Sequence, residues 1–187
     1  MHSKNTFLFL CMPAALIAGI CLGTVASARS DSSALFSAAA ESIASSTLCL
    51  DSFLKALRQN AIAAALLCIF GTTVLGVLPS AFLLCMRGYA VGKAVGALVA
   101  SFGFRGFFAA VCGVFPHNLI YVPFLCLLAV HGARFSKRLL FREGKSRGQL
   151  TTYLLSSLFL TLPLILGCLV EGYISAPLLK SVLGAHL

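Results

Sequence analysis

The sequence predicts an all-α, polytopic integral membrane protein with about five transmembrane helices. Hydrophobic residues make up 59% of the 187 residues and charged residues only 10%, whereas about one quarter of a soluble domain is charged. The mean hydropathy of +0.99 agrees with this class. Apolar runs also recur along the chain, and each approaches the roughly 20 residues that a helix needs to cross a bilayer.

The net charge of +9 is interpreted as a signature of membrane topology. Basic residues flank membrane spans on the cytoplasmic side, where anionic lipid attracts them. The chain lacks the pattern of aromatic residues interleaved with basic residues that would indicate nucleic-acid binding. We therefore expect membrane lipid as a partner, and no nucleic acid.

The first element is expected to be an N-terminal membrane anchor at residues 1–28, with its apolar core at 6–26. The triplet Ala26-Ser27-Ala28 resembles a small-residue cleavage site, so a cleaved signal peptide is the alternative. The apolar run is longer than a typical signal core. We therefore favour an uncleaved anchor.

Residues 29–52 are expected to form an extracytoplasmic loop. The segment is rich in serine and alanine and contains Asp31, Glu41 and Asp51, whereas Arg29 is its only basic residue. This composition is typical of a polar loop between two spans.

Residues 53–187 are expected to form a four-helix membrane domain. The predicted spans cover residues 60–78, 79–104, 107–133 and 150–174.

Short segments connect and introduce these spans. An amphipathic segment at 53–60 leads into the first of them and is expected to lie at the membrane interface. Pro79 suits the first turn of a new helix. Residues 103–106, Gly-Phe-Arg-Gly, indicate a short turn.

A basic cluster between the last two spans sets the predicted orientation. It consists of Arg134, Lys137, Arg138, Arg142, Lys145 and Arg147. The positive-inside rule places such a cluster in the cytoplasm. Counting spans in both directions then predicts a cytoplasmic N-terminus and an extracytoplasmic C-terminus.

Small residues recur every four positions in the third span, at Gly88, Gly92, Gly96 and Ala100. One face of this helix is therefore nearly bare, so that another helix can approach it closely. The functional alternative is a pore lined by bare backbone.

Three polar residues are candidates for contacts inside the membrane: Lys93, His117 and Glu171. We expect Arg87 to extend to an interface, as long basic side chains often do. Lys93 lies deeper, where it either does the same or faces a partner. Glu171 is expected to face the protein interior or the outer interface beside Tyr173.

The segment GVFPHNLIYVPF, residues 113–124, places two prolines in an apolar span. Pro116 and Pro123 each remove a backbone donor, so the carbonyl groups that they free need other partners. His117 and Asn118 can supply these locally, which would make the segment a structural joint. The alternatives are a ligand site, an ion path or a docking surface for another membrane protein.

The sequence gives little support for catalysis. A metal site would need convergent ligands, but His117, His131 and Glu171 show no metal-binding spacing, and there is no H-E-x-x-H motif. No G-x-S-x-G motif is present, and the whole chain has five acidic residues. We therefore expect no catalytic residues, no metal and no cofactor.

Five segments together resemble the stage II sporulation protein M family. They are SFLKALRQN, RGYAVGKAVGAL, GFRGFFAAV, FPHNLIYVPF and EGYISAPLL. The family motif corresponds to Pro116, His117, Asn118, Leu119, Ile120 and Pro123. The resemblance covers roughly residues 50–185. The broader family often has a glycine where Asn118 stands, and an extra alanine, Ala176, separates Ser175 from Pro177.

The resemblance implies a non-catalytic membrane scaffold that acts in sporulation. Such a protein would lie in the mother-cell membrane at the septum during engulfment of the forespore. It would anchor two peptidoglycan-degrading enzymes, a lytic transglycosylase and an amidase/endopeptidase. A small membrane permease or transporter subunit is the alternative function.

Overall fold

A computed structural model describes the chain over residues 2–29, 49–73, 75–140, 147–175 and 177–178. Throughout these ranges the regular structure is helical, which confirms the predicted all-α class. The elements are α1 (His2–Arg29), α3 (Cys49–Gly71), α4 (Val77–Phe102), α5 (Phe104–Gly113), α6 (Phe115–Leu140), α7 (Arg147–Val170) and the π-helix η1 (Glu171–Ser175).

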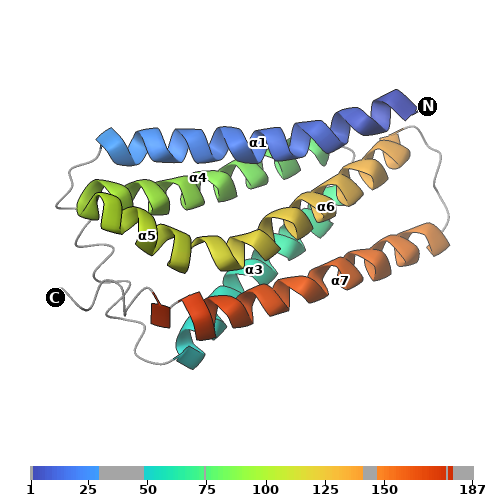
Figure 1. The fold of residues 1–187 in the computed structure, drawn as a ribbon. Coiled ribbons are helices and arrows are strands. Elements are labelled where there is room, and N and C mark those ends of the chain that lie inside the picture. The colour runs from blue at the N-terminus through green and yellow to red at the C-terminus, as the bar shows by residue number, and fades with distance from the viewer. Residues whose placement is uncertain (1, 30–48, 74, 141–146, 176, 179–187) are drawn as a thin grey trace.

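Five of the described helices are long and apolar enough to cross a membrane, as predicted. These candidate spans are Phe9–Arg29, Leu50–Gly71, Val77–Phe102, Phe115–Leu140 and Gly148–Ser175. Figure 1 shows them lying along one another as one bundle, in which α1, α4 and α7 run in one direction and α3 and α6 in the other. As a result, α1 begins at the end of the bundle where α6 ends and α7 begins.

The predicted loop at 29–52 is wrong at both of its boundaries. α1 continues through Arg29, and α3 already begins at Cys49. Asp51 stands in the first turn of α3, where a negative charge interacts favourably with the helix dipole. The predicted short interfacial segment, 53–60, is likewise part of α3. Residues 30–48 lie outside the described ranges.

The fourth predicted span, 107–133, is also corrected, because it consists of two helices. α5 has 10 residues, or about 15 Å of helix, which is too short to cross a bilayer. The helix is interrupted at Val114, and α6 then runs from Phe115 to Leu140. Pro116 therefore stands in the first turn of α6, where its missing N–H costs little, and Pro123 lies inside that helix.

The turns on either side of α4 also differ from the prediction: the turn before α4 begins earlier in the chain, and the turn after it is shorter. The second span ends at Gly71 instead of residue 78. Between α4 and α5, Gly103 alone makes the turn, with φ of 57°, a left-handed conformation that favours glycine.

Ser136 on α6 holds the connection between α3 and α4. Its hydroxyl donates to the Thr73 carbonyl oxygen at 2.6 Å, and it accepts a hydrogen bond from the Gly76 N–H at 3.1 Å. The Gly76 N–H also donates to the Thr73 carbonyl oxygen at 3.2 Å, so the buried hydroxyl gives each of these two backbone groups a second partner.

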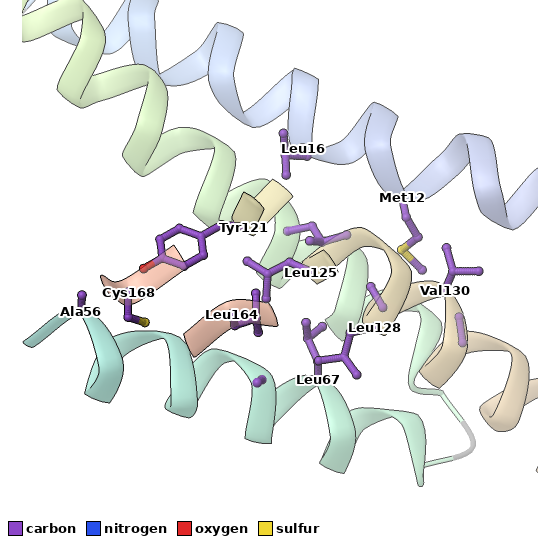
Figure 2. Packing of buried hydrophobic residues seen from close by; sticks show 14 residues of the cluster. Met12, Leu16, Ala56, Leu67, Tyr121, Leu125, Leu128, Val130, Leu164 and Cys168 are labelled. Atoms are coloured by element: carbon purple, nitrogen blue, oxygen red, sulfur yellow. The ribbon is translucent and has the colours of Figure 1, made fainter. Parts of the chain in front are cut away.

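The hydrophobic core runs along the inside of the bundle and includes residues from α1, α3, α4, α6 and α7. Leu67, Leu84 and Leu128 are fully buried in it. Figure 2 shows side chains from several helices meeting here, with Met12 and Leu16 reaching in from α1. α1 therefore packs as an integral member of the bundle.

Candidate functional site

The glycine row of α4 forms a close contact with α1. A Cβ atom on Gly88 would collide with the backbone of Leu16 and Ile20, and one on Gly92 would collide with the backbone of Ile20. Gly96 meets the Ser27 side chain in the same way. Only glycine permits this approach of two backbones, which is the use of small residues that membrane helices commonly make.

α1 contributes a matching row that the sequence analysis missed. Cβ atoms on Gly19 and Gly23 would collide with the backbone of α4 around Tyr89. The four-residue spacing in IAGICLGTVAS was the signal that could have revealed this row. Ala100, in contrast, is exposed, so the close contact ends at Gly96 within the described residues.

Tyr121 and Glu171 connect α6 to η1. The Tyr121 hydroxyl donates to Glu171 Oε2 at 2.8 Å. Figure 2 shows the Tyr121 ring reaching from α6 toward Cys168 on α7. A Cβ atom on Gly167 would collide with this ring, so the glycine leaves the space that the tyrosine fills. Glu171 therefore faces the interior, one of the two placements expected for it.

Arg87 turns inward, so the expectation that it extends to an interface is wrong. Its guanidinium donates to Asn60 Oδ1 on α3 and interacts electrostatically with Glu171. Asn60 is buried and donates in turn to the Ala56 carbonyl oxygen at 2.9 Å. An inward arginine paired with polar groups is the usual way in which a charge is accommodated inside a membrane protein. Lys93, in contrast, is exposed on α4.

His117 and Asn118 lie at the break between α5 and α6. The Asn118 Nδ2 donates to the Val114 carbonyl oxygen at 2.7 Å, and it lies 3.2 Å from His117 Nε2. His117 Nδ1 is 3.2 Å from the Ser175 hydroxyl. The two side chains therefore provide partners beside a helix break, as expected of a proline-shaped joint, and His117 also connects that joint to η1.

We call the eight residues that these contacts join the polar cluster. They are Asn60, Arg87, His117, Asn118, Tyr121, Cys168, Glu171 and Ser175. The edge-on contact of the His117 and Tyr121 rings, with centroids 5.6 Å apart, connects the two parts of the cluster. They come from α3, α4, α6, α7 and η1. The cluster therefore contains residues of every described spanning helix except α1. The close glycine contact with α4 holds α1 in the bundle instead.

The remaining motif and basic residues are placed as follows. Pro116 and Ile120 are half-buried, and Leu119 and Pro123 are exposed. Arg134 and Lys137 are half-buried, and Arg138 is exposed. Arg142 and Lys145 lie outside the described residues, and of Arg147 only the helical backbone is described.

The arrangement is suited to holding helices together. Hydrogen bonds between membrane helices stabilise their association, although each contributes only about 1 kcal/mol. Among the described residues, no group of three or more histidine, cysteine, aspartate or glutamate side chains is placed to hold a metal ion. The polar cluster brings His117 and Glu171 together and uses Arg87 as its cation in place of Lys93.

Replacing Tyr121 by phenylalanine is expected to lower the free energy of unfolding by about 1 kcal/mol, because a hydrogen bond between two membrane helices is lost. The measurement is the thermal unfolding midpoint of the purified protein in detergent. Tyr173→Phe is the matched control, since Tyr173 is exposed. Equal midpoints for the two variants would contradict a stabilising role for the Tyr121–Glu171 contact.

The comparisons with known proteins agree with the motifs. The family model of stage II sporulation protein M matches residues 7–176, so the match also takes in α1, beyond the region from about residue 50 where the motifs lie. No curated protein and no solved structure matches the chain. Because the match spans nearly the whole chain, the protein belongs to the stage II sporulation protein M family.

Proposed function

We propose that this protein is a non-catalytic membrane scaffold that anchors and localises peptidoglycan-degrading enzymes at the septum during forespore engulfment. Membership of the stage II sporulation protein M family is the observation that carries the proposal, since it identifies a sporulation-related membrane protein. The expected partners are a lytic transglycosylase and an amidase/endopeptidase. The protein acts from the mother-cell membrane.

The geometry of the spans supports a scaffold more than a permease. The glycine row was the candidate for a pore lining, but the backbone of α1 lies directly against Gly88 and Gly92. The other candidate, His117, is paired with Ser175 and Asn118. Both features therefore contribute to packing between helices, which is what a rigid anchor requires.

The partner surface is proposed to lie at the end of the bundle opposite the basic cluster. The positive-inside rule assigns the end with Arg134 and Arg138 to the cytoplasm. The segment 29–52 and the neighbouring helix ends then face the intermembrane space, where wall-degrading enzymes work. This segment contains acidic residues at Asp31, Glu41 and Asp51.

Deleting the gene is expected to block thinning of the septal wall and to leave both enzymes dispersed. The measurement is fluorescence microscopy of tagged enzymes in sporulating cells, combined with electron microscopy of the septum. Normal engulfment in the deletion strain would overturn the proposal.

Replacing residues 30–48 by a glycine–serine linker of equal length is expected to disperse the enzymes while the protein still inserts into the membrane. The matched control replaces residues 141–146 in the same way but retains Arg142 and Lys145. The control variant should localise the enzymes as the unaltered protein does. If the two variants behave alike, the partner surface does not lie in residues 30–48.

A further inference from the structure

A polar cavity of about 580 Å³ opens between α6 and α7, at the end of the bundle where α6 ends and α7 begins. It lies apart from the polar cluster. Four of its lining residues come from α6 and five from α7. They include His131, Arg134 and Arg138 on α6, and Gln149, Thr152 and Ser156 on α7. The residues that line it include no carboxylate.

The spacing of these residues explains why they share one cavity. Positions that are three, four or seven residues apart lie on one face of a helix, and the six polar residues named above follow this spacing, three on each helix. The face of α6 carries two guanidinium groups, and the face of α7 carries an amide and two hydroxyls. Such a set of donors and positive charges favours an anion with several oxygen atoms.

Arg134 has a buried donor that remains unused. Its guanidinium carbon lies 4.4 Å from the centre of the Phe9 ring on α1, a cation–π contact that fixes the side chain. Its buried Nε has no hydrogen-bond partner among the described residues. Because a buried donor without a partner is costly, this nitrogen points to a ligand.

One wall of the cavity is held rigidly by stacked aromatic rings. The Tyr153 ring lies nearly parallel to those of His131 and Phe135, with centroid separations of 5.2 Å and 4.3 Å. Its hydroxyl donates to the Cys68 carbonyl oxygen on α3 at 3.0 Å. α6, α7 and α3 are thereby fixed together, so the cavity is preformed.

We propose that this cavity binds the phosphate of an anionic phospholipid headgroup. The cavity lies within the first ten residues of α7, at the depth where headgroups meet a spanning helix. Exposed apolar side chains of the same helix, such as Leu154 and Leu155, provide a surface for the acyl chains. Basic pockets between membrane helices recognise such headgroups elsewhere, and the N-terminal dipole of α7 adds to the attraction.

The test uses the full-length protein in neutral detergent, with phosphatidylglycerol or phosphatidylcholine added. Binding is measured from the rise of the thermal unfolding midpoint with lipid concentration. Phosphatidylglycerol should raise the midpoint, and phosphatidylcholine should not. The double variant Arg134→Gln/Arg138→Gln should weaken the apparent affinity for phosphatidylglycerol by about thirtyfold, because each basic group near anionic lipid contributes to binding.

The matched control is Lys55→Gln/Arg58→Gln, which removes the same charge from exposed positions on α3. It should bind phosphatidylglycerol as the unaltered protein does. Equal weakening in both double variants would overturn the site, because it would show attraction by net charge alone. If inorganic phosphate alone raises the unfolding midpoint as much as phosphatidylglycerol does, the cavity binds a free anion, and the proposal of a lipid ligand is overturned. If the double variant does not fold, Arg138→Gln alone at the exposed position should still weaken binding, and unchanged binding would contradict the proposal.

Discussion

Replacing Gly92 by leucine is expected to separate α1 from α4 and to cause a large loss of stability. The new side chain would project into the backbone of Ile20, and a backbone cannot move aside as a side chain can. We expect the free energy of unfolding to fall by about 3 kcal/mol, and the unfolding midpoint to fall by about 10 °C. Gly23→Leu should have a similar effect from the other side of the contact.

Ala100→Leu is the matched control for this prediction. It places the same leucine side chain in the same row of the same helix, but at an exposed position. Its midpoint in detergent should stay within about 2 °C of that of the unaltered protein, since exposed substitutions usually change stability by less than about 0.5 kcal/mol. If Gly92→Leu and Ala100→Leu are equally stable, the close contact between α1 and α4 is incorrect.

Replacing Arg87 by methionine is expected to have the second large effect, a fall of about 1.5–3 kcal/mol in the free energy of unfolding. Methionine preserves much of the apolar contact but removes the cation that interacts with Glu171 and the donor to Asn60. Removing the charged donor leaves the buried Asn60 without this partner, which is destabilising. The measurement is again the unfolding midpoint in detergent, with the yield of folded protein as a second measure.

Lys93→Met serves as the control on the same helix, because Lys93 is exposed and should tolerate the change. A second variant tests the cause of the loss. Adding Glu171→Gln to Arg87→Met should restore part of the stability, since the uncompensated carboxylate is removed. A double variant no more stable than Arg87→Met would indicate that Arg87 acts without Glu171.

The sequence was sufficient to predict the class and number of the spans, because the hydrophobic length of a helix is a local property. The boundaries were less predictable. Proline at 116 was interpreted as a kink inside one span, whereas the break precedes it at Val114 and Pro116 stands in the first turn of α6. A proline is compatible with both arrangements, and the close packing of α5 against α4 at Gly106 is a tertiary contact that the local sequence does not reveal.

The polar cluster was only partly predictable, since it depends on which face of each helix turns inward. Arg87 and Lys93 are six residues apart, and at about 100° per residue they stand on different faces of α4. Both are basic residues in one apolar span, so composition could not distinguish the inward one. The glycine row could not do so either, because at about 100° per residue both basic residues lie about 120° from the face of Gly88 and Gly92 that α1 covers. The direction of Arg87 toward Asn60 depends on where α3 packs.

The central claim is that this family member holds wall-degrading enzymes at the septum, and affinity purification from sporulating cells tests it most directly. The tagged full-length protein is extracted in mild detergent, and the proteins that accompany it are identified by mass spectrometry. The account predicts recovery of a lytic transglycosylase and an amidase/endopeptidase, both greatly reduced when residues 30–48 are replaced by the linker. Recovery of neither enzyme with the unaltered protein would contradict the account.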